Sequence, residues 1–252
     1  MSRLFIKQAA VALLAGLWVG SLQADTVLGL TMSVDAWDMD SDGAFADNST
    51  LTDFDHGSET PAAFSFALEH PVPVVPNFRL RFTDLSSSGR TDLESTFDFG
   101  GVTYPVNARL GTEFNLQSSD FIFYYELLDN DTISFDLGVN GKYLDGDIEV
   151  SDGTQNSRQS FTGVVPMLYG AVKFGIPTTR FSVFGDFNLL SVGDHTLRDY
   201  TAGAAYTLVD NMAVDFSLRG GYRRFNLELD DLDGIHADWS FDGLFLGVEA
   251  DF

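Results

Sequence analysis

The sequence contains no cysteine and few basic residues. None of its 252 residues is Cys, which excludes disulfides, metal–thiolate sites and cysteine nucleophiles. Lys and Arg number 14 against 37 Asp and Glu, so the formal net charge is −23. Nucleic-acid binding depends on clustered Lys and Arg that neutralise phosphates. We therefore expect no nucleic-acid partner.

Long apolar runs are also lacking after residue 24. Arg3 and Lys7 precede an apolar stretch from Ala9 to Leu22 that is too short to span a bilayer. This pattern is typical of a secretory leader, and a cleavage site is predicted after Ala24. We expect a cleaved signal peptide over 1–24, export by the general secretory route, and a mature domain over 25–252 without a transmembrane helix.

What the mature chain does contain is apolar residues with a period of two. Ile133, Phe135, Leu137 and Val139 alternate with small or polar residues, which places four apolar side chains on one face of a strand. No segment after Ala24 sustains helical spacing. The alternation recurs and predicts ten strands, at 26–36, 62–70, 77–84, 120–128, 132–144, 161–176, 181–192, 196–208, 212–225 and 236–252.

The connections between these strands differ in length. Short turns with Pro, Asn and Asp occupy 71–76, 129–131, 177–179 and 209–211, and longer polar segments occupy 37–61, 85–119, 145–160 and 226–235. This layout predicts an all-β fold, a transmembrane antiparallel up-and-down β-barrel of ten strands in the bacterial outer membrane, with short periplasmic turns and long acidic extracellular loops. Eight strands remain an alternative, and a soluble periplasmic β-sandwich is the contrary fold.

The end of the chain supports the barrel. Leu244, Leu246, Val248 and Ala250 alternate with other residues up to a C-terminal Phe252. A terminal aromatic residue that closes an alternating strand resembles the assembly signal of outer-membrane barrels. We therefore expect Phe252 to engage the barrel assembly machinery.

Several segments carry a family resemblance that covers nearly all of the mature chain. They are Leu28-Gly29, 70–80 (HPVPVVPNFRL), 123–130 (FYYELLDN), 141–146 (GKYLDG), 166–170 (PMLYG) and 221–223 (GYR). These resemble a family of Gram-negative outer-membrane barrel proteins found in bacteria with the GlyGly-CTERM (rhombosortase) sorting system. The resemblance implies the fold and the location, and it implies no activity and no functional residues.

If the apolar face is turned to lipid, the other face places charged side chains in the lumen. The inward residues predicted in this way are Glu69, Arg79, Arg81, Glu126, Asp136, Lys142, Lys173, Asp186, Asp199, Asp215, Arg219, Arg223 and Glu249. Ten strands enclose little more space than side chains can fill. The leading interpretation is a salt-bridged plug. The alternative is a narrow pore for small solutes, lined by Arg79, Arg81, Arg219 and Arg223.

One acidic segment has a spacing typical of a metal site. Asp38, Asp40, Asp42 and Gly43 reproduce the first half of a calcium loop, but the Glu expected at its twelfth position is Ser49. We expect no dedicated metal site and no cofactor, with weak binding of divalent cations by the acidic loops. Such cations would bridge these loops to lipopolysaccharide.

Aromatic residues fall near the ends of the predicted strands. We expect Trp37, Tyr143, Tyr222, Phe225, Trp239 and Phe241 to form an outer girdle, and Phe78, Phe174, Phe181 and Phe252 an inner one, where the barrel crosses the membrane interfaces.

Signs of catalysis are few. Asp194 and His195 are adjacent in a predicted outer loop, and neither G-x-S-x-G nor H-E-x-x-H occurs. We expect a monomeric structural or surface-interaction barrel rather than an enzyme. A narrow channel is the second hypothesis, and a surface hydrolase the third.

Overall fold

A computed structural model describes residues 28–252 except 48–49, 73, 131, 193–194, 212 and 233–234. The expected signal peptide at 1–24 lies outside the described residues. Among the residues described, no helix is long and apolar enough to cross a membrane. The described chain is folded into antiparallel β-strands.

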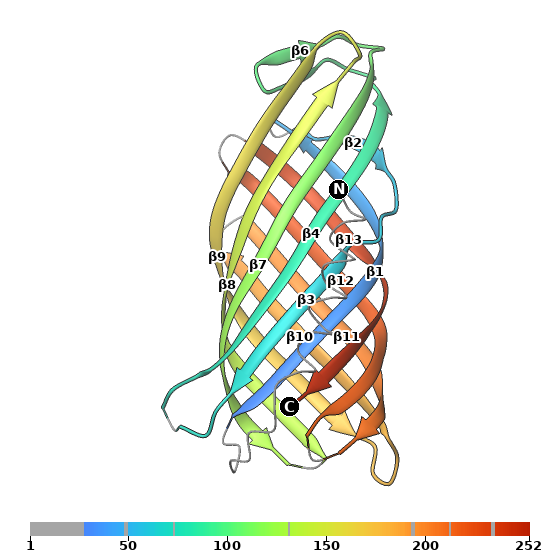
Figure 1. The fold of residues 1–252 in the computed structure, drawn as a ribbon. Helices are drawn as coiled ribbons and strands as arrows, with labels where there is room; N and C mark the ends of the chain where they lie inside the picture. Colours follow the sequence, from blue (N-terminus) through green and yellow to red (C-terminus); the bar gives the residue numbers. More distant parts are fainter. Residues whose placement is uncertain are drawn as a thin grey trace.

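Ten strands form the wall of a barrel (Figure 1). They are β1 (Gly29–Ala46), β3 (Ala62–Glu69), β4 (Asn77–Asp92), β7 (Arg109–Asp129), β8 (Ile133–Ser151), β9 (Asn156–Gly175), β10 (Phe181–Val192), β11 (His195–Asp210), β12 (Asp215–Leu232) and β13 (Ile235–Asp251). Each strand pairs with the next one in this order, and β13 pairs with β1 from Asp251 opposite Thr31 to His236 opposite Ala46. The predicted ten-stranded antiparallel barrel is confirmed.

Three short strands lie at one end of this wall. β2 (Thr52–His56) pairs with β1 and β4 beyond the end of β3. β5 (Phe97–Phe99) and β6 (Val102–Tyr104) form a separate hairpin between β4 and β7. We call this end of the barrel the loop end. The opposite end, the turn end, carries the short connections after β3, β7, β9 and β11 and the start of β1.

The main strands continue into segments that were predicted to be loops. The predicted loop at 145–160 consists mostly of β8 and β9, which are joined by four residues. β1 continues through 37–46 of the predicted loop at 37–61, and β4 and β7 take up 85–92 and 109–119 of the one at 85–119. β12 continues through 226–232 of the predicted loop at 226–235. The prediction of long polar loops was wrong for these segments. Apolar and polar residues still alternate in these segments, but here the polar residues face outwards and the apolar residues face inwards. The prediction assumed apolar residues on the outward face, so it assigned no strand there.

β8 shows this change of polarity. Its outward residues Phe135, Leu137 and Val139 are apolar and exposed, whereas Asp145, four positions beyond Gly141 on the same face, begins an acidic series. Its inward residues change the other way, from polar Asp136, Asn140 and Lys142 to apolar Leu144, Ile148 and Val150. We call the part with an apolar exterior the turn half, and the part with a polar exterior the loop half.

Strand length explains why two halves exist. A membrane-spanning strand needs about 9–11 residues, whereas β7, β8 and β9 contain 21, 19 and 20 residues. Only about half of each strand can therefore face hydrocarbon. The rest stands in water and must bury apolar side chains inwards.

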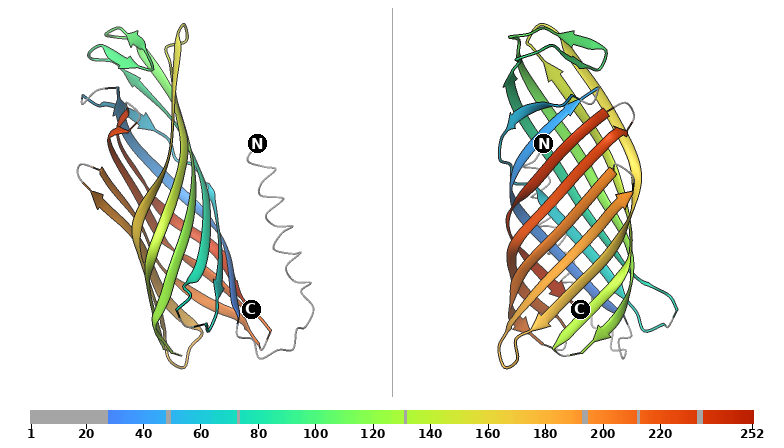
Figure 2. Two further views of the ribbon diagram at one scale, coloured as in Figure 1. Left: turned by 90° about the vertical axis from the view of Figure 1, so that its left-hand side faces the viewer. Right: turned by 180° about the vertical axis from the view of Figure 1, so that it is seen from behind.

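The loop half is uneven in height. β7, β8 and β9, together with the β5–β6 hairpin, reach furthest at the loop end (Figure 2). β10 pairs with β9 only from Leu168 to Gly175, so the part of β9 before Leu168 pairs with β8 alone. Pro166 in that part has no backbone N–H to donate to a further strand.

Candidate functional site

The barrel interior contains three successive levels. A cavity lies at the turn end, and a layer of buried ion pairs lies above it. We define the ion-pair layer by its charged residues Arg81, Asp120, Lys142, Asp186, Asp199 and Arg223. Above this layer, aromatic side chains fill the loop half.

Lys142 of β8 is the centre of the ion-pair layer. Its side chain has an exposed fraction of 0%, and its Nζ lies 2.8 Å from Oδ1 of Asp120 and 3.0 Å from Oδ2 of Asp199. Nζ also lies 5.1 Å from the centre of the Phe225 ring. Asp199 belongs to β11, three strands away from β8. The pair therefore crosses the lumen.

Two arginines extend the layer to the other side of the barrel. Arg223 of β12 donates from Nε and Nη2 to the two carboxylate oxygens of Asp199, at 3.1 and 2.9 Å, and from Nη1 to Thr83 of β4 at 3.1 Å. Arg81 of β4 donates to Asp186 of β10 at 2.8 Å. A bidentate guanidinium–carboxylate pair fixes both side chains. These bonds tie β4, β10, β11 and β12 together through the centre of the barrel.

The aromatic core of the loop half also spans the lumen. Trp239 of β13 stacks on Phe114 of β7, with ring centres 4.1 Å apart, and on Phe241 at 5.6 Å. Phe45 stacks on Phe54 at 4.7 Å. The close approach of the Trp239 ring to β1 requires Gly43, because a Cβ there would lie 2.5 Å from the ring.

The β5–β6 hairpin closes this core at the loop end. Its residues Phe97, Phe99 and Tyr104 are buried in the aromatic cluster. The Tyr104 hydroxyl donates to the carbonyl of Val150 in β8 at 3.0 Å and lies 2.8 Å from the Ser157 hydroxyl in β9. The hairpin is thereby fixed across the mouth of the barrel.

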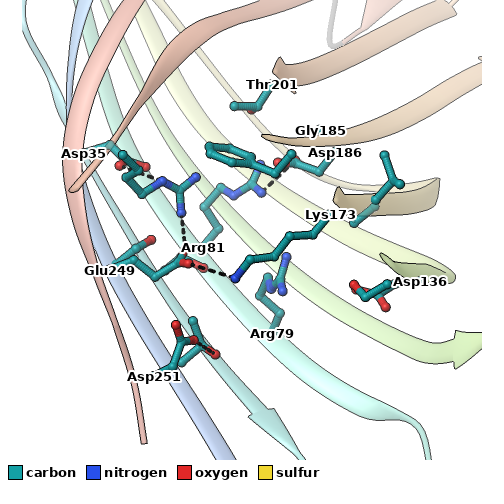
Figure 3. A pocket seen from close by; sticks show the side chains of 18 of the residues that line it. Asp35, Arg79, Arg81, Asp136, Lys173, Gly185, Asp186, Thr201, Glu249 and Asp251 are labelled. Atoms are coloured by element: carbon teal, nitrogen blue, oxygen red, sulfur yellow. Dashed lines mark hydrogen bonds and ion pairs between the residues drawn. The ribbon is translucent and has the colours of Figure 1, made fainter. Parts of the chain in front are cut away.

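The cavity at the turn end has a volume of about 400 Å³ (Figure 3). On one side, Arg219 of β12 lies 2.6 Å from Glu249 and 3.3 Å from Asp35, and Lys173 lies 3.7 Å from Glu249. The Arg219 guanidinium also lies 4.5 Å from the centre of the Phe184 ring. Lining residues near the short turns include Asp129, Thr132, Gly175 and Asp251, so the cavity opens at the turn end.

Arg79 has a different environment from the other cavity arginines. It donates to the Tyr169 hydroxyl at 2.7 Å, and its guanidinium lies 5.3 Å from the centre of the Tyr124 ring. Tyr124 in turn donates to Glu69 at 2.7 Å. Arg79 is thus held by aromatic rings and a phenol rather than by a carboxylate.

The structure places most of the predicted inward charges in the interior. Those that line the cavity are Glu69, Arg79, Arg81, Glu126, Asp136, Lys173, Asp186, Arg219, Arg223 and Glu249, and Lys142 and Asp199 lie in the ion-pair layer. Asp215 instead lies at the turn-end rim, where it accepts from the backbone N–H of Asn211 at 3.2 Å. It does not line the cavity.

The predicted inward charges did not include Asp35, Asp129 and Asp251, which line the cavity, or Asp120 in the ion-pair layer. Asp120 stood at the first position of a predicted strand, although its spacing from Ile122 and Tyr124 gives it the same inward face. The alternation thus already assigned Asp120 to the lumen. It was left out because the predicted strand began at 120, whereas β7 begins at Arg109.

The structure does not support a calcium loop in the segment whose spacing resembles one. Asp38, Asp40 and Asp42 lie within β1 rather than in a turn, where successive outward carboxylates are about 7 Å apart along the strand. They cannot surround one cation as a calcium loop does. Among the described residues, no three His, Cys, Asp or Glu side chains are grouped to hold a metal ion.

The predicted outer girdle is wrong for four of its six residues. Tyr143 and Tyr222 face outwards, but Trp37, Phe225, Trp239 and Phe241 are buried in the lumen. Phe225 follows the inward Arg223 by two positions, so it must share the same face. Asp194 and the His195 side chain lie outside the described part of the structure.

Comparison with known proteins supports the barrel and assigns no family. No family model matches the sequence, and no curated protein does. Among solved structures, the chain is similar to the outer membrane protease OmpT from Escherichia coli, with 10% identity over 93% of this chain and 99% of that chain and a TM-score of 0.53. The translocator domain of the autotransporter NalP from Neisseria meningitidis is 10% identical over 96% of both chains, with a TM-score of 0.44. At such identity the likeness shows the fold alone, which is that of a bacterial outer-membrane β-barrel.

Proposed function

We propose that this protein is an integral outer-membrane barrel that does not conduct solutes, and that its loop half stands above the membrane as a rigid acidic body for contacts at the cell surface. The turn end would then face the periplasm. The proposal includes export by the general secretory route, assembly through the C-terminal strand and a monomeric state.

The observation that carries the proposal is the filled lumen. The ion-pair layer joins strands on opposite sides of the barrel, and the aromatic core does so again above it. A solute that crosses the barrel would have to displace both levels. Breaking a buried ion pair alone costs about 3–5 kcal/mol.

Single-channel recording tests this proposal. The full mature chain is refolded, checked for a heat-dependent shift on a gel, and inserted in a planar bilayer beside a porin as the positive control. We expect no discrete current steps from this protein. Reproducible steps would overturn the closed barrel and support the narrow channel lined by arginines.

The exterior of the loop half supports the surface role. Its outward residues include exposed or half-buried carboxylates on several adjacent strands, namely Asp38, Asp40, Asp42, Asp53, Asp55, Glu113, Asp145, Asp147 and Glu149. Lipopolysaccharide is itself anionic, so the two surfaces attract one another only through divalent cations.

Cation-dependent binding tests this part. The protein in detergent is titrated with lipopolysaccharide in Mg²⁺ and again with excess EDTA. We expect most of the binding to disappear in EDTA and to fall in the triple variant Asp38→Asn, Asp40→Asn, Asp42→Asn. Equal binding in Mg²⁺ and EDTA would contradict cation bridging.

Two contacts at the turn end support the assembly role of Phe252. Its backbone N–H donates to the carbonyl of Leu30 at 2.9 Å, and its carbonyl accepts from Leu30 at 3.2 Å. The last residue is thus part of the seam that closes the barrel. The resemblance to the rhombosortase-associated family belongs to the same proposal and adds no activity to it.

A further inference from the structure

The cavity at the turn end has more carboxylates than its cations neutralise. Its ion pairs involve Arg81, Lys173, Arg219 and Arg223. Among the described residues that line it, Arg79 is the only other basic one. Five further lining carboxylates form no ion pair with any described residue, and these are Glu69, Glu126, Asp129, Asp136 and Asp251. The cavity therefore has a net negative charge that its own residues do not balance.

Asp136 of β8 is the most deeply buried of these five carboxylates. The residue has an exposed fraction of 7% and lines the cavity, and its carboxylate makes no hydrogen bond or ion pair with any described residue. In Figure 3 its carboxylate lies apart from the ion pair that joins Lys173 of the neighbouring strand β9 to Glu249. Burying a carboxylate without a partner is costly.

The neighbours of Asp136 increase this cost and leave space beside it. Glu126 lies directly opposite it in β7, and like charges in such a pair destabilise a sheet. On the other side, its partner in β9 is Ala171, whose methyl group fills little of the cavity. Two carboxylates thus border an unfilled space, and neither forms an ion pair with a described cation.

The shape of the site favours an organic cation over a metal ion. In the part of the chain that the structure describes, no three metal-ligating side chains are grouped. The volume of about 400 Å³ lies within the range of small-molecule sites, about 300–1,000 Å³. A compact ammonium group donates three hydrogen bonds and matches a pair of carboxylates.

We propose that this cavity binds a small organic amine, with its ammonium group between Asp136 and Glu126. The ligand enters from the turn end, because the ion-pair layer and the aromatic core occupy the lumen above. This site is independent of the acidic exterior of the loop half.

Isothermal titration with 1,4-diaminobutane tests the proposal on the full mature chain in a non-ionic detergent. We expect saturable binding of about one molecule per chain, weakened at least tenfold by Asp136→Asn. The matched control is Asp145→Asn, which removes the same charge from the outward face of the same strand and should leave the affinity unchanged. Glu126→Gln, expected to weaken binding less, provides a second variant if Asp136→Asn does not fold.

Three results of the amine titrations would overturn the inference, and one result of a Mg²⁺ titration would do so as well. The three are no binding by folded wild-type protein, equal affinity in wild type and Asp136→Asn, and equal binding of the uncharged analogue 1,4-butanediol. Titration with Mg²⁺ separates a metal site from an amine site. Binding of Mg²⁺ that depends on Asp136 and excludes the diamine would also overturn it.

Discussion

The turn half and the loop half are built from the same strands and have opposite chemistry. In the turn half, apolar side chains face outwards and charges face the lumen, whereas the loop half has the arrangement of a water-soluble β-barrel. In both halves, successive side chains of a strand point alternately inwards and outwards, whatever their chemistry. The medium on each side decides which residues suit each direction, so a change of polarity along a continuous strand marks the edge of the membrane.

The ion-pair layer lies where the two halves meet. Inward Lys142 belongs to this layer, and inward Leu144 already belongs to the apolar core. Outward Tyr143, between them, is half exposed as expected of an interface residue. The lumen therefore changes from a charged cavity to an apolar core at the level where the exterior leaves the membrane.

The largest expected effect comes from opening the core of the loop half. Trp239→Ala removes a ring with 0% exposure that stacks on Phe114 and Phe241. We expect the free energy of unfolding to fall by about 5 kcal/mol, since both transfer energy and a cavity are involved. Urea unfolding of the refolded protein in lipid vesicles measures this change.

Leu246→Ala is the matched control in the turn half. Leu246 lies on the same strand, pairs with Ala36 of β1 and is 61% exposed on the outward face. Lipid fills the space left by its side chain, so only transfer energy is lost, about 1–2 kcal/mol. Equal losses in the two variants would mean that the loop half has no close-packed core.

The next effect tests the boundary between the halves. Lys142→Met leaves Asp120 buried without a cation and should lower the free energy of unfolding by about 3 kcal/mol. Lys173→Met in the cavity is its control, because Lys173 is 51% exposed and lies 3.7 Å from a Glu249 that Arg219 also holds. We expect a loss below about 1 kcal/mol there. A larger loss for Lys173→Met would contradict a structural role for the layer.

A new charge on the exterior locates the membrane directly. Val139→Arg places a cation on the outward face of the turn half and should cost about 2–3 kcal/mol in vesicles. Ser160→Arg places the same cation on the outward face of β9 in the loop half and should change stability by less than about 0.5 kcal/mol. Similar costs at both positions would show that the apolar exterior does not end near Tyr143.

The sequence predicts the strands of the turn half well and those of the loop half poorly. Ile133, Phe135 and Leu137 alternate with polar residues in the sense expected for lipid, so β8 is recognised. Beyond Tyr143 the same strand continues as Asp145 and Asp147 outwards, a composition that single-sequence reasoning assigns to a loop. Only the pairing with β7 and β9 shows that it is a strand.

The sequence predicted which side chains face the lumen but not which of them contact one another there. The alternation assigned Lys142, Asp199 and Arg223 to the lumen. It could not show that they meet, because the register and the strand order decide which residues face one another across the barrel. The inward position of Trp239 and Phe241 also followed from the alternation, yet an aromatic residue near a strand end was assigned to a membrane girdle instead.

The smallest expected effect is a loss of stability at low pH that comes from a histidine of the loop half. His56 lies in β2 of the loop half, with its ring centre 4.5 Å from that of Trp239. Burial lowers the pKa of its imidazole to about 4, although Asp53 and Asp55 act in the opposite direction. Its Nε2 is buried without a hydrogen-bond partner among the described residues, so a proton there would introduce an uncompensated charge.

Protonation should therefore weaken the loop half in a defined pH range. The unfolded chain binds a proton at His56 near pH 6.5, whereas the folded protein does so only near pH 4. The unfolded state thus binds more protons between these values, and this contribution to stability is complete above about pH 6.5 and lost as the pH falls towards 4. We expect wild type to lose about 1–2 kcal/mol more than His56→Gln over this range, a value reduced because the ring is not fully buried. Urea unfolding at each pH measures this difference. If both proteins lose the same free energy of unfolding between pH 6.5 and 4, the acid sensitivity belongs to other groups.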